Sequence, residues 1–385
     1  MSQHAVLSPS SGKRWMSCTP SARLEMEFTD KGSEAAREGT LAHKLAENMI
    51  RLRLGDLSEE ALAAIEECKA DSLYSSEMLH YIQEYVDYVL EQFESARAHT
   101  ADAVIFLEHR IDLTAYIPEG FGTGDVIIIA DGVLRIIDLK YGKGVPVSAV
   151  DNHQMKIYGL GALREFEILY HITEVEMTIY QPRLDSISVW SISEPELCAW
   201  GADELVPKAR MAFEGKGEFV AGDHCRFCKA ASLCRANAEK NLEVAQYEFR
   251  EAPLLTDAEV ADILSRADQF TKWISGVEEF ALEAAVKEGK RWPGYKLVEG
   301  RSNRTYSDRE KVATTLKEGG FTEEQIYEPQ TLLSITAMEK SIGKKAFSLH
   351  LDGLIVKPAG KPALVPASDK RPELNSIDSA INDFS

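Results

Sequence analysis

Two short apolar runs separated by a tight-turn signal constrain the fold of this chain most strongly. Residues 123–130 and 133–139 consist largely of aliphatic and β-branched side chains, and Asp131-Gly132 lies between them. β-Branched runs of this length favour strands, and Asp-Gly favours the two-residue turn of a β-hairpin. The sequence therefore predicts an antiparallel pair of strands near the middle of the chain.

Charged side chains mark the ends of these two strands. Asp125 opens the first run, and Asp138-Leu139-Lys140 closes the second. Because successive side chains of a strand point to opposite faces, Asp138 and Lys140 share one face, about 6–7 Å apart. The hairpin brings Asp125 to the same edge of the sheet. Two carboxylates beside one amine suit a divalent cation, a water and a phosphate, so we expect phosphodiester hydrolysis.

The periodicity of the surrounding sequence predicts an α/β fold with a mixed sheet. The order between residues 58 and 181 is α-β-β-β-α-β, which differs from the regular repeat of a parallel sheet. A stripe of large apolar residues at helical spacing is interpreted as core; it comprises Tyr81, Tyr85, Val89 and Phe93. The expected helices are residues 33–54, one or two helices within 58–98, and 152–167, and the expected strands are 103–113, 123–130, 133–139, 174–181 and 186–192.

Charge and hydropathy limit the partners. A net charge of −19 argues against a protein that coats DNA generally, because phosphate repels such a surface. It allows a nucleic-acid enzyme, since bound cations and local basic stretches reverse the sign inside a groove. Residues 287–311 and 340–372 are two such stretches, each either a solvated face or a phosphate contact. No apolar run reaches the roughly 20 residues that span a bilayer. The N-terminus lacks the apolar segment of a secretory signal, so we expect a cytoplasmic protein without a membrane partner.

Five short motifs follow one another along the chain, and together they resemble a known nuclease family. They are Gly39-Thr40-Leu41-Ala42-His43, Gly124-Asp125, Asp138-Leu139-Lys140, Gln154-Met155-Lys156-Ile157-Tyr158 and a set of four cysteines. Over roughly residues 8–240 the chain resembles the RecB-like branch of the PD-(D/E)XK nuclease superfamily. That branch includes CRISPR-associated RecB-like exonucleases and the nuclease domains of bacterial end-resection enzymes. The resemblance implies a restriction-endonuclease-like αβββαβ core with an N-terminal helical insertion.

The resemblance also implies a metal site. His43, Asp125, Asp138 and the backbone carbonyl of Leu139 would bind Mg²⁺ or Mn²⁺, and hard oxygen donors with one imidazole suit these ions. Such an ion activates a bound water and neutralises charge on the scissile phosphate. Lys140 would position that water and hold a phosphate oxygen. Many relatives carry glutamate in place of Asp138, and the family motif admits both.

Further residues are assigned around this site. Gln154 and Tyr158 are four positions apart and share a helix face. The resemblance places them beside the active site, where they steady the lysine or contact DNA. Glu108 on the first strand either assists the cation or its water, or is an ordinary surface carboxylate.

The cysteines suggest a second metal centre. Cys225 and Cys228 have CxxC spacing, Cys234 follows, and Cys18 lies far upstream. In a chain expected to be cytoplasmic, such thiols favour a metal over disulfides. The resemblance implies a [4Fe–4S] cluster on these four residues, with tetrahedral zinc or free thiols as alternatives. Either metal would tie the N-terminal helix to the end of the nuclease domain.

Three regions are predicted from these patterns. Residues 1–240 form the RecB-like nuclease domain closed by the four cysteines. Residues 241–356 form a C-terminal α+β extension of open role. Residues 357–385 are rich in proline and then polar, which is typical of an extended or disordered tail.

We therefore expect a metal-dependent DNA exonuclease, a phosphodiester hydrolase acting on linear duplex or single-stranded DNA ends. The layout is similar to phage proteins, which implies end resection for recombination in the cytoplasm of a bacterial host. A single-strand annealing or recombination protein would be its partner. The alternatives are a CRISPR-adaptation-type nuclease, a non-catalytic DNA-binding or scaffold protein that retains the fold, and a zinc-stapled regulatory protein. The motifs leave polarity, strand preference, endonuclease activity and oligomeric state open.

Overall fold

The computed structural model describes residues 5–28, 32–242, 256–298 and 309–318, with five single positions between 335 and 350. The chain divides into two units, residues 1–288 and 289–385. The second unit contains helix α11, Arg309–Glu318. Most of the predicted extension beyond residue 298, nearly all of the basic stretch 340–372 and the tail 357–385 lie outside the described residues, whereas residues 287–298 and 309–311 of the first basic stretch are described. The boundary expected at residue 240 stays a prediction.

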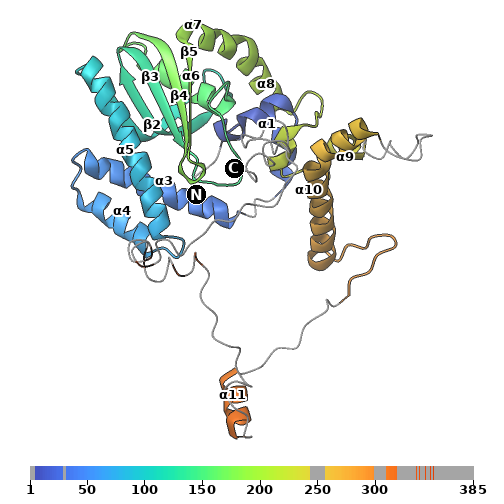
Figure 1. Cartoon of the computed structure of the whole chain (residues 1–385). Helices are drawn as coiled ribbons and strands as arrows, with labels where there is room; N and C mark the ends of the chain where they lie inside the picture. Colours follow the sequence, from blue (N-terminus) through green and yellow to red (C-terminus); the bar gives the residue numbers. More distant parts are fainter. Residues whose placement is uncertain are drawn as a thin grey trace, which may run out of the picture. The chain divides into compact units, whose positions relative to one another are not determined.

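A five-stranded mixed sheet forms the centre of the first unit (Figure 1). Its strand order follows the sequence, and all neighbours are antiparallel except the parallel pair β3 and β4. Gly132 at the predicted hairpin turn has a φ of +87°, which glycine adopts without steric cost. The strands are β1 Val104–Asp112, β2 Phe121–Ala130, β3 Gly132–Leu139, β4 Ile172–Gln181 and β5 Ser186–Ser193. The predicted α/β class, the mixed sheet and the αβββαβ order of elements are confirmed.

Helices cover both faces of the sheet (Figure 1). The helices α3, α4 and α5 pack on one face, and α6 packs on the other with α1, α7 and α8 around it. The predicted N-terminal helical region is confirmed, and Ser33 caps α3 by accepting a hydrogen bond from the amide of Ala36. The α-helices among the described residues of this unit are α1 Gly12–Ser17, α2 Ser21–Leu24, α3 Glu34–Arg53, α4 Glu59–Ala70, α5 Ser76–His99, α6 His153–Phe166, α7 Glu194–Trp200, α8 Val206–Glu214, α9 Arg235–Leu242 and α10 Asp257–Lys287.

The central strand β2 is buried on both faces. Val126 and Ile128 belong to the core beneath α3 and α5, whereas Ile127 and Ile129 belong to the core beneath α6. Burial on both faces explains why this run is continuously apolar rather than alternating. The two cores hold the sheet between two helical layers, and the polar site forms where β3 ends beside the middle of β2.

Helix α6 lies unusually close to the sheet. A Cβ at Gly161 would lie 2.3 Å from a methyl carbon of Ile111 on β1. Only glycine permits this approach, because it has no side chain to displace. The close packing fixes α6 against the sheet, and α6 carries Gln154 and Tyr158.

Candidate functional site

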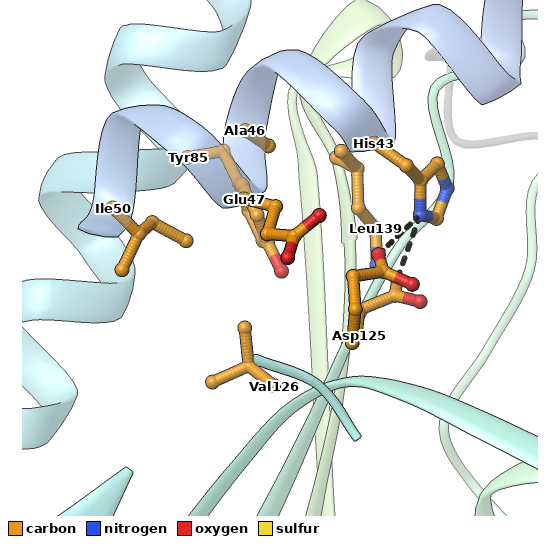
Figure 2. Close-up of a pocket in the computed structure, with 9 residues that line it drawn as sticks. His43, Ala46, Glu47, Ile50, Tyr85, Asp125, Val126 and Leu139 are labelled. Atoms are coloured by element: carbon orange, nitrogen blue, oxygen red, sulfur yellow. Dashed lines mark hydrogen bonds and ion pairs between the residues drawn. The ribbon is translucent and has the colours of Figure 1, made fainter. Parts of the chain in front are cut away.

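Three side chains from three different elements converge beside the end of β3, and Figure 2 labels two of them, His43 and Asp125. His43 comes from α3, Glu108 from β1 and Asp125 from β2. His43 Nδ1 lies 3.3 Å from Asp125 Oδ2 and 3.7 Å from Glu108 Oε1. Their ligand atoms all lie within 4.8 Å of one another. One imidazole and two carboxylates at this spacing are a donor set that suits a divalent cation.

Asp125 is held by the neighbouring strand. The backbone amide of Leu139 donates a hydrogen bond to Asp125 Oδ2, with 2.7 Å between the two atoms. The ladder between β2 and β3 begins with the pair Val126 and Ile137, so this side-chain bond continues it by one step. The carboxylate is therefore set by backbone atoms of two strands.

Glu108 occupies a strained backbone conformation in the middle of β1. Its φ is +46°, whereas its neighbours Leu107 and His109 pair regularly with Val126 and Gly124. A left-handed conformation is costly for a residue with a side chain, and such strain concentrates at functional sites. The sequence left Glu108 open between cation ligand and surface carboxylate. The structure brings it to His43, and nothing in its spacing could have indicated the strain.

A second group of polar side chains adjoins the first. Asp138, Lys140, Gln154 and Tyr158 come together here. Asp138 is only 2% exposed. Its Oδ1 accepts a hydrogen bond from Gln154 Nε2 at 2.8 Å, and Lys140 Nζ donates to Gln154 Oε1 at 3.1 Å. Lys140 Nζ also lies 2.8 Å from Asp138 Oδ2, and Tyr158 Oη lies 3.5 Å from Gln154 Nε2. Gln154 thus links the acid to the amine.

Asp138 lies outside the group of three ligand atoms that includes Asp125. Its Oδ2 is buried and pairs with Lys140 Nζ, and it has no other partner among the described residues. A buried carboxylate oxygen with a single partner can accept a further interaction. It leaves one more hard oxygen for a cation at this edge of the sheet.

The charges of the site depend on one another. Burial lowers the pKa of His43, but the carboxylate of Asp125, followed by Glu108 and Asp138, outweighs burial and raises it to about 11. Burial raises the pKa of Asp138. Burial lowers the pKa of Lys140, but the charges of Asp138 and Asp125 outweigh it, so the pKa is raised and the amine stays protonated. Two cationic side chains thus neutralise the carboxylates where a metal ion would otherwise do so.

A pocket of about 200 Å³ opens from the three converging side chains towards α5. Its polar lining consists of His43, Glu47, Tyr85, Glu108 and Asp125, and its remaining lining is mostly aliphatic. The sequence assigned Tyr85 to the core, and its burial at 1% exposure confirms this. The tyrosine has a second property that periodicity did not indicate, because it also lines the pocket. Burial, followed by the charges of Asp125 and Asp138, raises its pKa well above the ordinary value, so the phenol stays neutral.

The four cysteines singled out in the sequence line one cavity of about 310 Å³. Cys18 follows α1, Cys225 and Cys228 lie at a short 3₁₀ segment, and Cys234 precedes α9. Burial raises the pKa of Cys228 to about 12. No three cysteine sulfur atoms in the described part of the chain lie within 4.8 Å of one another. The two remaining cysteines do not line this cavity.

Hydrogen bonds join the N-terminal segment to the segment that carries the cysteine trio. Each of the four contacts spans about two hundred residues of sequence. They are Thr19 Oγ1 to the carbonyl of Lys216 at 2.6 Å, Arg23 Nε to the carbonyl of Phe213 at 2.6 Å, Arg14 Nη1 to the carbonyl of Phe227 at 3.0 Å, and the amide of Lys229 to Glu25 Oε1 at 2.7 Å. The chain thus closes a long loop at this cavity.

Comparison with known proteins places the chain in a family. Residues 4–372 match the family described as "Protein of unknown function (DUF2800)". The chain belongs to the DUF2800 family. This DUF2800 protein is also similar to a solved structure described as "Crystal structure of SSO0001". The two sequences are 18% identical, and the match covers 57% of this chain and 95% of that chain, with a TM-score of 0.22. A likeness at that score supports no conclusion about fold or activity.

Within the ranges that the structure describes, no helix combines the length and apolar character required to cross a bilayer.

Proposed function

We propose that this DUF2800 protein is a metal-dependent DNA exonuclease of the RecB-like PD-(D/E)XK type. It would hydrolyse phosphodiester bonds at DNA ends and supply single strands to an annealing or recombination protein, in a phage or prophage setting. One observation carries the proposal. His43, Glu108 and Asp125 converge within 4.8 Å at the sheet edge where Asp138, Lys140 and Gln154 bind one another.

The residues present fit Mg²⁺ or Mn²⁺. His43 Nδ1 and the carboxylates of Glu108 and Asp125 would hold the ion, with Asp138 Oδ2 and the carbonyl of Leu139 as further oxygen donors. The oxygen-rich set suits both ions, and the imidazole favours manganese. When bound, the ion supplies an activated water and charge neutralisation at the phosphate.

The protein's own residues position the substrate and the water. Lys140 is protonated, and its ammonium group can donate to a phosphate oxygen and to the attacking water. Gln154 accepts a hydrogen bond from Lys140 and donates one to Asp138, so both side chains keep a fixed orientation. Because these groups lie on the ends of packed strands and on α6, little reorganisation is needed when DNA binds.

The cysteine site fits a structural metal group. We propose that Cys18, Cys225, Cys228 and Cys234 hold a [4Fe–4S] cluster. The proposal rests on the four thiols that line one cavity, and a tetrahedral zinc ion is the alternative occupant. Its role would be to tie the N-terminal segment to residues 213–234.

The test compares DNA degradation by the parent and by site variants. End-labelled linear duplex, single strand and closed circle are incubated with Mn²⁺ and with the parent, Asp138→Ala, Lys140→Ala or the control Lys69→Ala. Lys69 is an exposed lysine on α4 whose nitrogen pairs with Glu66. We expect the parent and Lys69→Ala to degrade linear DNA, and the two site variants to lose at least about 100-fold in rate. Equal rates in all four proteins, or no cleavage by the parent, would overturn the proposal.

A further inference from the structure

The inner half of the pocket contains a polar group that the proposed reaction does not use. Tyr85, on α5, is 1% exposed, and its hydroxyl has no hydrogen-bond partner among the described residues. Tyr85 and Glu47 both line the pocket that His43 and Asp125 also line, as Figure 2 shows. Buried hydroxyls nearly always have a partner, so a partner from outside the chain is expected here.

The surroundings of this hydroxyl identify the missing partner. Ile50 and Val126 line the same inner space and offer no polar atom. The opposite end of the pocket is formed by the carboxylates of Glu108 and Asp125 and by His43, the groups assigned to the cation. A buried water needs two to four polar partners, and a cation, a hydroxyl and a carboxylate together provide them.

We propose that the Tyr85 hydroxyl holds a water molecule bound to the divalent cation, with Glu47 as the second partner of that water. This inference rests on the proposed metal site. A water on a cation gives a lone pair to the metal and donates its protons, so its protein partners must be acceptors. Tyr85 Oη and the Glu47 carboxylate are acceptors. Arg51 Nη2 lies 2.6 Å from Glu47 Oε1 and keeps that carboxylate in position.

Tyr85 is then a positioning residue that acts through the hydration of the cation. It lies beneath α3 and does not reach the surface, so it does not contact DNA. Mg²⁺ gives up its waters reluctantly and usually keeps several when it binds to a protein. Mg²⁺ therefore depends more than Mn²⁺ on a partner for a retained water, and loss of the hydroxyl should weaken Mg²⁺ binding more than Mn²⁺ binding.

The experiment measures cation affinity and does not depend on DNA cleavage. Isothermal titration calorimetry with Mg²⁺ and with Mn²⁺ is performed on the full chain and on Tyr85→Phe, which removes one oxygen and keeps the ring. The matched control is Tyr88→Phe, on the same helix but outside the pocket lining. Asp125→Asn tests the metal site itself. Outer partners of metal-bound groups typically contribute 10- to 100-fold in affinity, so we expect Tyr85→Phe to lose about that much for Mg²⁺, and less for Mn²⁺. Tyr88→Phe should match the parent.

The outcomes separate this inference from the proposed function. If the parent binds both cations and Asp125→Asn does not, the metal site stands. Unchanged Mg²⁺ affinity in Tyr85→Phe then overturns the role of the hydroxyl alone. An equal loss for both cations, together with a lower unfolding temperature, shows a structural role and also overturns it. If the parent binds neither cation, both the proposed function and this inference fail.

Discussion

The carboxylate of Asp125 on β2 accepts a hydrogen bond from the backbone amide of Leu139 on β3, with 2.7 Å between Asp125 Oδ2 and Leu139 N. This bond lies where the backbone ladder of the two strands ends. It couples the position of an acidic side chain to the register of the sheet. The site is therefore built on rigid elements, and a change in register would misplace the carboxylate.

Two substitutions at Asp125 should separate its charge from this hydrogen bond. Asp125→Asn keeps an oxygen that can accept from Leu139 but loses the negative charge, so we expect loss of cation binding with the fold retained. Asp125→Ala also leaves the Leu139 amide without its partner, which costs about 1–3 kcal/mol. Urea unfolding of the metal-free proteins should show Asp125→Ala to be less stable than Asp125→Asn by about that amount. Equal stabilities would show that this hydrogen bond does not contribute to the free energy of unfolding.

Gln154 should affect the rate of reaction more than DNA binding. Gln154→Ala removes the group that joins Lys140 to Asp138. Both side chains then gain rotational freedom in the transition state, where their orientation determines the rate. We expect kcat to fall by about 10- to 100-fold with little change in KM. Steady-state kinetics on linear duplex measures this, with Gln83→Ala on the exposed face of α5 as control. A rise in KM at unchanged kcat would instead assign Gln154 to DNA binding.

Glu108→Gly should be more stable than Glu108→Ala, and both substitutions should weaken the metal site. Glu108→Gly and Glu108→Ala both remove the carboxylate, but only glycine relieves the strain of a φ of +46°. We expect the metal-free glycine variant to be more stable than the alanine variant by about 1 kcal/mol. Both variants should gain less thermal stability on addition of Mn²⁺ than the parent gains. Differential scanning calorimetry with and without Mn²⁺ measures both quantities. An alanine variant as stable as the glycine variant would show that the backbone stores no strain.

Removal of one cysteine should release the metal group and loosen the N-terminal segment. Anaerobically purified parent should absorb near about 400 nm, as thiolate-bound iron–sulfur clusters do, and Cys234→Ser should not. Because the cluster closes a loop of about two hundred residues, its loss should lower the unfolding temperature by several degrees (about 2–4 °C per kcal/mol at this size). Cys198→Ser, outside the cavity, is the control. If the purified parent contains zinc rather than iron, the four cysteines bind a tetrahedral zinc ion and the cluster proposal is wrong.

His153 should make the protein less stable in mild acid. Burial, followed by the charge of Lys156, lowers the pKa of His153 below its ordinary value of 6.5. Above pH 6.5 the ring is neutral in both states, and as the pH falls below 6.5 the unfolded chain takes up the proton first. As the pH falls from 6.5 to the pKa of the folded state, the free energy of unfolding decreases by at most about 1.4 kcal/mol per pH unit.

Comparison of unfolding at two pH values tests this dependence. Urea unfolding at about pH 7.5 and pH 5.5, above the range where most carboxylates titrate, should show a smaller loss of stability for His153→Gln than for the parent. His99→Gln, with an exposed ring at the end of α5, is the control and should behave as the parent does. If His153→Gln and the parent lose the same amount, the histidine does not contribute.

Local patterns were sufficient to predict much of the fold. The apolar runs on either side of Asp131-Gly132 became β2 and β3, because β-branched side chains and a turn glycine act within a few residues of sequence. Helical spacing located α3 and α6, which begin and end within one or two residues of the predicted limits. The same local rules placed Asp138 and Lys140 on one face of a strand end.

The sequence by itself therefore determined the elements, their order and most of the polar residues at the sheet edge. Only the tertiary structure decided that Glu108 turns towards His43 and that Tyr85, a residue of an apolar stripe, presents its hydroxyl to the same pocket. The physical reason is the distance along the chain over which each effect acts. Periodicity reports which face of an element is buried, whereas a strained backbone angle and a meeting of side chains from α3, α5, β1 and β2 depend on how separate elements pack.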